Sequence, residues 1–147
     1  LNNSSLVARP LGRFRWVTCA SPDYLREYGV PPSPEALSQH RAVHYFSGQA
    51  RRADEFRFVR HGETFSVPVS GNAAVNETGL YIKMCLAGFG LAQLAENIVA
   101  DHLQEGRLVE VLTDWQPPPV PVTLLYPHQR FLSPAVRAFA EWMSEVV

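Results

Sequence analysis

The sequence predicts an α/β fold, and three observations support this prediction. Strand-like segments that alternate apolar and polar residues are interspersed with amphipathic, helix-like segments. The pair Ser-Pro begins a predicted helix at three places, because serine caps a helix and proline fits its first turn. Residues 72–94 join a turn, a capped helix, a glycine stop and the start of a buried strand. A chain of 147 residues that is 46% hydrophobic can also bury a core.

Several strand-like segments in the first seventy residues end at turn residues. Gly12 separates the first two, and Gly62 supplies the positive φ of a hairpin turn between the last two. Two short helices lie among them, one that starts at Ser21 and stops at Gly29, and one that starts at Ser33. The predicted strands are residues 5–11, 13–20, 41–46, 55–60 and 64–69.

The helix within residues 72–94 is the element around which the rest is arranged. We expect Asn76 to be its N-cap and Gly88 to be the residue just past its end. A helix N-terminus that follows a strand is a common place for a small ligand in α/β proteins. The predicted apolar face of the helix consists of Leu80, Met84 and Ala87, with Ile82 or Cys85 beside them.

The last third of the chain contains further alternating elements. Residues 95–106 predict one helix or two short ones, and residues 107–112 predict a strand. The proline-dense segment 114–121 is stiff and extended, so it is the best candidate for a boundary between lobes. Residues 121–126 predict another strand, and residues 133–147 predict an amphipathic helix.

Charge and hydropathy exclude several classes of protein. The formal net charge of -1 argues against a nucleic-acid-binding module, which normally carries a basic excess on one face. No apolar run approaches the about 20 residues of a membrane span, and the first ten residues lack the apolar core of a signal peptide. We therefore expect a cytoplasmic protein that contacts no membrane. Because the chain begins at Leu1 without methionine, we also expect it to be a piece of a longer protein.

Two groups of residues allow two interpretations each. Cys19 and Cys85 lie in apolar segments, so they are buried structural thiols or, as the less favoured alternative, a redox pair. The arginines near the predicted hairpin form either an anion-binding patch or a solvated face that nearby carboxylates balance, and we favour the solvated face. These arginines are Arg51, Arg52, Arg57 and Arg60, with Asp54, Glu55 and Glu63 as the carboxylates.

No catalytic motif is present, so we expect no enzyme. Residues 88–90 (GFG) follow a helix and lack the third glycine of a dinucleotide-binding loop. The five histidines fall on different elements with no cysteine or carboxylate at ligand spacing, so we expect no metal site and no cofactor. Ser21 lacks the Gly-x-Ser-x-Gly setting of a nucleophile, and a capping role fits it better.

Polar residues follow several of the predicted strands at their carboxyl ends. In an open α/β sheet these ends meet at one edge, and ligands bind in the crevice there. The sequence therefore predicts a small-molecule site at this edge. The residues are Ser21, Ser47 with Gly48, Asn76 with Glu77 and Thr78, and Gln93.

Short motifs occur in a fixed order along nearly the whole chain. They are residues 6–12 (LVARPLG), 19–25 (CASPDYL), 33–37 (SPEAL) with 40–41 (HR), 88–92 (GFGLA), 106–109 (GRLV), 126–127 (YP) and 133–139 (SPAVRAF). Together, and above all through ASP-x-YL and SP-x-VRAF, they resemble the effector-binding domain of LysR-type transcriptional regulators. One departure from this pattern is Ala95, where many relatives have proline.

The resemblance implies a periplasmic-binding-protein-like fold, in which two α/β lobes are joined by two crossing strands and bind an inducer between them. One complete lobe and the C-terminal part of the other would be present. Residues 1–15 would be the remnant of the first lobe with the first crossing strand, and residues 16–114 the second lobe. Residues 115–147 would contain the second crossing and return to the first lobe with the C-terminal helix. The cleft would be faced by Ser21, Tyr45, Phe46, Ser47, Gly48, Asn76, Glu77, Thr78 and Gln93.

The implied function is effector sensing that modulates transcription. By the same resemblance the partners are a small-molecule effector and further copies of the chain in a homodimer or tetramer. DNA would be bound only through an N-terminal helix-turn-helix that this sequence does not contain. Because helix N-termini lie behind Ser21 and Asn76, we expect the effector to be a small carboxylate. The alternatives are a periplasmic-type solute-binding protein and, third, an enzyme.

Overall fold

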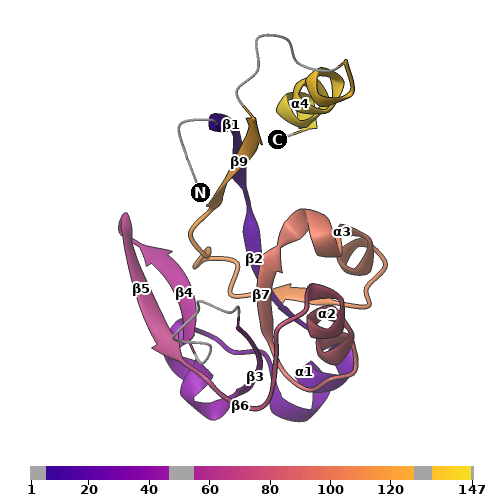
Figure 1. Cartoon of the computed structure of the whole chain (residues 1–147). Coiled ribbons are helices and arrows are strands. Elements are labelled where there is room, and N and C mark those ends of the chain that lie inside the picture. Colours follow the sequence, from indigo (N-terminus) through magenta and orange to yellow (C-terminus); the bar gives the residue numbers. More distant parts are fainter. Residues whose placement is uncertain (1–5, 47–54, 128–133, 147) are drawn as a thin grey trace. The chain divides into compact units, whose positions relative to one another are not determined.

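The chain forms two compact units (Figure 1). The computed structural model describes residues 6–46, 55–127 and 134–146. Unit 1 comprises Leu1–Phe14 and Pro119–Val147, and unit 2 comprises Arg15–Pro118. The mixture of helices and strands confirms the α/β class that the sequence predicts.

Unit 1 contains a two-stranded antiparallel ribbon and one helix. β1 (Leu6–Phe14) pairs with β9 (Val120–Pro127), and α4 (Pro134–Val146) lies against β1. The prediction that Gly12 ends the first strand is wrong. Gly12 lies inside β1, where its φ of 124° lets the strand accommodate one extra residue, Leu11, relative to β9.

The centre of unit 2 is β2 (Trp16–Ala20). It runs between β7 (Ala92–Ala95) and β8 (Val109–Val111) and is antiparallel to both. Four of its five residues are buried, because both of its edges are paired and both of its faces are covered. The strands predicted after the glycine stop and within residues 107–112 are confirmed as β7 and β8.

Three strands of unit 2 run parallel to one another. β3 (Arg41–Tyr45) pairs in parallel with β6 (Ser70–Val75). A parallel bridge between Ala42 and Leu91 links β3 to the residue that precedes β7. Thus β3, β6 and β7 run in one direction and β2 runs against them. The carboxyl ends of the three parallel strands therefore lie at the end of the unit where β2 begins.

β6 is a strand that sequence patterning does not predict. We expect a turn at the start of residues 72–94, because the segment SGNAAV consists of small and polar residues with little preference for strands. The segment becomes a strand by packing its backbone against β3. A Cβ added at Gly71 would lie 2.1 Å from the carbonyl oxygen of Ala42, so only glycine permits this approach.

The predicted hairpin is confirmed. β4 (Glu55–Arg60) and β5 (Glu63–Pro68) pair in the antiparallel direction through a two-residue turn at His61 and Gly62. Both turn residues have positive φ, 54° and 78°, as a type I′ turn requires. Phe56 and Phe58 on the inner face of the hairpin are buried in the core.

One arginine of the hairpin, Arg60, forms an ion pair. Arg60 makes two hydrogen bonds to the carboxylate of Glu35, of 2.9 and 3.2 Å, and its guanidinium lies over the ring of Phe65. Arg51 and Arg52 lie outside the described residues. The Arg60 ion pair supports the interpretation of this face as solvated and charge-balanced.

Two of the three predicted Ser-Pro helix starts lie in the described residues. Before α1 (Pro22–Tyr28), Ser21 Oγ accepts the backbone N–H three residues on at 3.1 Å, which confirms the predicted cap. Ser33 precedes a short 3-10 helix, η2 (Pro34–Gln39), and its side chain makes no capping hydrogen bond. The third serine, Ser133, lies outside the described residues.

The N-cap of α2 (Thr78–Leu86) differs from the prediction. Glu77, and not Asn76, is the capping residue, because its Oε2 accepts the Leu80 N–H at 2.9 Å. The carboxylate also lies at the positive end of the helix dipole, which stabilises it there.

We predict that Glu77→Ala lowers the free energy of unfolding by about 1 kcal/mol, because the Leu80 N–H loses its acceptor. The matched control is Asn76→Ala, which removes the exposed side chain one residue earlier and leaves the cap intact. Urea denaturation of the two variants measures the difference. An Asn76→Ala variant that loses as much stability as Glu77→Ala would contradict this assignment of the cap.

The end of α2 is as predicted, and its buried face is as predicted only in part. Gly88, with a φ of 88°, follows the helix in a Schellman arrangement, in which the N–H groups of residues 88 and 89 donate to carbonyls of the last turn. The buried residues of the helix are Tyr81 and Cys85, whereas Leu80 is 48% exposed. Of the predicted face, Cys85 is buried and Ile82 and Met84 pack against the core, whereas Leu80 and Ala87 are exposed.

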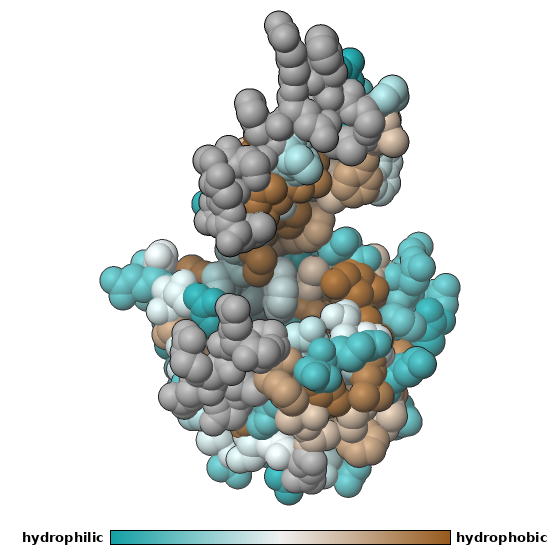
Figure 2. Space-filling model, viewed as in Figure 1, coloured by the Kyte–Doolittle hydropathy of each residue, from teal (hydrophilic) through white to brown (hydrophobic). Residues whose placement is uncertain are grey.

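α3 (Glu96–Gln104) confirms the helix predicted within residues 95–106. Val99 faces the core, whereas Ile98 is 47% exposed. Figure 2 shows apolar side chains reaching the surface over α2 and α3, among polar ones. No helix in the described part of the chain has the length and apolar character that a membrane span requires.

Two buried clusters fill unit 2, and one of them contains both cysteines. Cys19 and Cys85 are 0% and 1% exposed, and the Cys85 thiol donates to the Cys19 carbonyl oxygen at 3.7 Å. The neighbouring Cys19 thiol and burial both raise the pKa of the Cys85 thiol. A protonated, enclosed thiol reacts slowly, which favours the interpretation of these residues as structural.

The other cluster borders a buried hydrogen bond between Tyr24 and His40. The Tyr24 hydroxyl accepts the Arg41 N–H at 2.9 Å and lies 2.8 Å from His40 Nδ1. The hydroxyl is therefore free to donate its proton to Nδ1, which requires a neutral imidazole. Burial lowers the pKa of His40 from its ordinary value of 6.5.

We predict that this histidine makes the domain less stable in acid. Its contribution is complete above pH 6.5 and is lost as the pH falls through the lowered pKa, because the unfolded chain then binds the proton more readily. Urea denaturation at pH 7.5 and 5 should show a smaller loss of stability in His40→Gln than in the parent. His61→Gln, at an exposed histidine, should keep the parental loss, and an equal reduction in both variants would contradict the role of His40.

Candidate functional site

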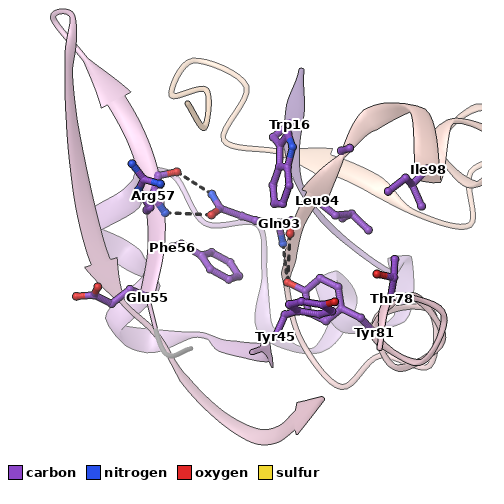
Figure 3. Close-up of a pocket in the computed structure, with 11 residues that line it drawn as sticks. Trp16, Tyr45, Glu55, Phe56, Arg57, Thr78, Tyr81, Gln93, Leu94 and Ile98 are labelled. Carbon is purple, nitrogen blue, oxygen red and sulfur yellow. Dashed lines mark hydrogen bonds between the residues drawn. The ribbon is translucent and has the colours of Figure 1, made fainter. Parts of the chain in front are cut away.

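A pocket of about 600 Å³ opens in unit 2, at the end where β3 and β7 finish and β2 begins (Figure 3). Its volume is in the range of small-molecule sites. Trp16 at the start of β2, Tyr45 at the end of β3 and Ala95 at the end of β7 line it. Thr78 joins them from the start of α2, which follows β6. The pocket thus lies where parallel strands of α/β sheets commonly present ligand sites.

Four aromatic side chains wall the pocket. Their rings reach one space from four different elements (Figure 3). Tyr45 and Tyr81 meet edge to face, with ring centroids 5.3 Å apart. Tyr81 and Phe56 are buried, whereas Tyr45 is 39% exposed and Trp16 is half-buried, so the last two offer open ring surface. The remaining apolar lining is Leu94, Ala95 and Ile98.

The Tyr81 hydroxyl connects α2 to β7. It accepts the Gln93 backbone N–H at 2.9 Å and donates to the Gln93 carbonyl oxygen at 3.4 Å. Burial raises the pKa of Tyr81, so the phenol is neutral. Because both of its hydrogen-bonding functions are used within the protein, this hydroxyl positions the helix at the pocket wall.

The side chain of Gln93 holds the β4–β5 hairpin beside β7. Its Oε1 accepts the Arg57 backbone N–H, and its Nε2 donates to the Arg57 carbonyl oxygen, each at 3.0 Å. Nε2 also donates to the Thr18 hydroxyl at 3.0 Å. The hairpin has no backbone pairing with the central sheet, so this amide takes the place of a neighbouring strand. Figure 3 shows the two bonds to Arg57.

The charged residues of the lining lie at its edge. Glu55 and Arg57 flank Phe56 on β4, and successive strand residues point to opposite faces. In Figure 3 the Glu55 carboxylate points away from the aromatic rings. Within residues 6–46, 55–127 and 134–146, no three histidine, cysteine or carboxylate side chains are grouped so as to hold a metal ion.

The structure brings together some of the residues that the sequence suggests. Tyr45, Thr78 and Gln93 line the pocket. Phe46 is 37% exposed, and its N–H donates to the Val75 carbonyl oxygen at 2.9 Å, but it does not line the pocket. Ser47 and Gly48 lie outside the described residues.

Ser21, Asn76 and Glu77 do not line the pocket. Because β2 runs against β3 and β7, its carboxyl end lies at the opposite edge of the sheet, and Ser21 is buried there as a helix cap. Asn76 is exposed, and the Glu77 carboxylate is used as the cap of α2. Strand ends meet at one edge only when the strands are parallel, and β2 is antiparallel to its neighbours.

The aromatic lining of the pocket could be predicted only in part from the sequence. Trp16 stands at the start of a strand, and Phe56 is an inward residue of a hairpin, so neither has the strand-end position that marked the other candidates. Tyr81 was not among the residues predicted for the apolar face of α2. Alternation in β4, with Phe56 and Phe58 on one face, was the available signal that this strand has a buried side.

A family model described as the LysR substrate binding domain matches residues 1–147. The chain belongs to this family. The resemblance seen in the sequence motifs is therefore confirmed, and the matched relatives of this LysR domain are regulators rather than solute-binding proteins.

Two curated relatives illustrate the similarity of this LysR domain to known regulators. The HTH-type transcriptional regulator YhjC of Escherichia coli (strain K12) is 34% identical over 147 residues, which are 100% of this chain and 49% of the relative. An HTH-type transcriptional repressor of Pseudomonas aeruginosa (strain UCBPP-PA14) is 36% identical over 146 residues, which are 99% of this chain and 46% of the relative. The chain thus spans about half the length of the curated relatives it matches.

Solved structures agree with this fold. The full-length Vibrio cholerae virulence activator AphB, a member of the LTTR family, matches with a TM-score of 0.78 and 26% identity over 99% of this chain and 49% of its own. The regulatory domain of CrgA from Neisseria meningitidis matches with a TM-score of 0.81 and 23% identity, over 99% of this chain and 71% of its own. At that identity the CrgA likeness concerns the fold alone.

Proposed function

We propose that this chain is the effector-sensing part of a LysR-type transcriptional regulator and that its effector binds in the pocket of unit 2. The observation that supports this most directly is the position of the pocket, at the shared end of β3 and β7 in a domain of this family. Binding there would favour one conformation or assembly of the regulator over another and so change transcription.

The other parts of the proposal follow from family membership. Unit 2 corresponds to the second lobe, and unit 1 to the part of the first lobe that the chain contains. The domain acts without catalysis, in the cytoplasm, as a homodimer or tetramer. DNA is contacted by a helix-turn-helix elsewhere in the regulator, in line with the HTH-type names of the relatives.

The structure changes the argument about the charge of the effector. The sequence predicts a small carboxylate because helix N-termini lie behind Ser21 and Asn76. Ser21 Oγ and Glu77 Oε2 already accept N–H groups at the starts of α1 and α2. The carboxylate at Glu77 also repels a second anion. A carboxylate effector would therefore be held at the outer edge of the pocket, where Arg57 is exposed.

A thermal-shift screen of small organic acids and neutral metabolites tests the proposed site. We expect at least one compound to raise the melting temperature of the 147-residue chain, and Tyr45→Ala to weaken that effect. The matched control is Phe89→Ala, which removes an aromatic ring that is 52% exposed and outside the pocket. Stabilisation that is equal in the parent and Tyr45→Ala would place the binding site elsewhere.

A further inference from the structure

The chemistry of the pocket wall points to the class of ligand it selects. We propose that the ligand is a planar aromatic compound whose ring lies among Trp16, Tyr45, Phe56 and Tyr81, with its polar group turned to the open side. This inference rests on the proposed function, since it concerns the same pocket. Three properties of the wall carry it: its aromatic surface, its saturated hydrogen bonds and the placement of its charges.

The aromatic surface combines fixed and open rings. Phe56 and Tyr81 are 3% and 4% exposed, and the packing around them leaves them little freedom. Tyr45 stands edge to face against Tyr81, so its orientation is also set. Trp16 and Tyr45 keep part of their ring surface open. A flat ring that enters this space finds preformed partners for stacked or edge-to-face contacts, which a saturated ring cannot match.

The hydrogen-bonding groups deep in the wall are already used. The Tyr81 hydroxyl is bonded to both backbone groups of Gln93, and the Gln93 amide is bonded to Arg57 and Thr18. A ligand that needed these groups would have to break bonds that hold the pocket together. A polar ligand group placed against Phe56 and Tyr81 would lose hydration without recovering a hydrogen bond from the Tyr81 hydroxyl or the Gln93 amide.

The charges lie away from the rings. The Glu55 carboxylate points outward from β4, and Arg57 is exposed on the same strand (Figure 3). A charged ligand group is therefore compatible only with the outer edge, and the ring is the part that the wall recognises. This separates the class from short aliphatic acids, which present a charge and no ring.

Three probes that differ in one property each test the inference on the 147-residue chain. Benzamide has a planar ring and no charge, cyclohexanecarboxamide replaces the planar ring with a saturated one, and benzoate adds a charge to the planar ring. Titrations followed by the indole N–H signal of Trp16 and the amide signals of Leu94 and Ala95 report binding at the wall. We expect benzamide and benzoate to shift these signals, and cyclohexanecarboxamide to bind at least about threefold more weakly.

Tyr45→Leu should weaken benzamide binding by about three- to tenfold, because it keeps apolar bulk but removes the ring. Phe89→Leu, at an exposed ring outside the pocket, should bind like the parent. Melting temperatures of both variants establish that they are folded. An unchanged affinity in Tyr45→Leu would overturn the proposed recognition.

The remaining outcomes separate the ligand class from the site. Equal binding of benzamide and cyclohexanecarboxamide at the wall would overturn the aromatic class and leave the proposed function standing. Binding of benzoate alone would assign recognition to the carboxylate and also overturn the class. If none of the three probes shifts the wall signals at millimolar concentration while a compound from the thermal-shift screen binds elsewhere, the pocket itself is the wrong site.

Discussion

Gly71→Ala is expected to lower the free energy of unfolding by more than about 3 kcal/mol or to prevent folding. The added Cβ would lie 2.1 Å from the Ala42 carbonyl oxygen, which belongs to the backbone of β3. β3 cannot move away from β6, because the segment that precedes β7 packs against its other edge. There a Cβ added at Gly90 would lie 2.8 Å from the Ala42 carbonyl carbon. The overlap must therefore be relieved by separating paired strands.

The matched control for this prediction is Gly79→Ala. Its added Cβ would lie 2.9 Å from Glu77 Oε1, which is the end of a flexible side chain, and alanine favours a helix. We expect a change within about 1 kcal/mol of zero for this variant. Urea denaturation and circular dichroism of both variants provide the measurement. A Gly71→Ala protein as stable as the parent would show that the approach of β6 to β3 is looser than the structure describes.

Gln93→Leu is expected to lower the free energy of unfolding by about 2–4 kcal/mol. The substitution keeps the apolar bulk but removes three hydrogen bonds, two to the backbone of Arg57 and one to Thr18. Thr18 is 1% exposed, so its hydroxyl loses a partner that water does not easily replace. The hairpin would then lose its attachment to β7, and the wall formed by Phe56 would become less well defined.

Hydrogen exchange provides a local measurement of the same effect. The Arg57 N–H depends on the Gln93 side chain, whereas the Val59 N–H on the same strand donates to the Gln116 carbonyl oxygen at 2.8 Å. In Gln93→Leu, Arg57 should exchange much faster while Val59 changes less. Gln93→Glu should also fail to restore the parent, because a carboxylate cannot donate to Thr18 or to the Arg57 carbonyl. Equal acceleration at both amides would indicate general destabilisation and not the loss of this attachment.

These two predictions show why the pocket could be inferred only in part from the sequence. Thr78 and Gln93 were predicted from their positions at strand ends and Tyr45 from the family resemblance, and all three line the pocket. Gln93 attaches the hairpin through Arg57, which lies 36 positions earlier in the chain. Local sequence patterns cannot predict a contact between residues so far apart. Helix phase was the other source of error, since Tyr81, a buried residue of α2, is adjacent to the predicted but exposed Leu80.

The sequence by itself determined the α/β class, the family, the α1 cap, the hairpin turn and the glycine stop of α2. Each of these depends on interactions between residues close in the chain or on motifs in a fixed order. Such features can be recognised from the sequence alone. Only the tertiary structure decided that residues 70–75 form a strand, that β2 runs against its neighbours and that Ser21 faces away from the pocket. Strand direction and backbone approach are set by partners far away in sequence. For the same reason the aromatic wall of the pocket, assembled from four separate elements, became visible only in the folded chain.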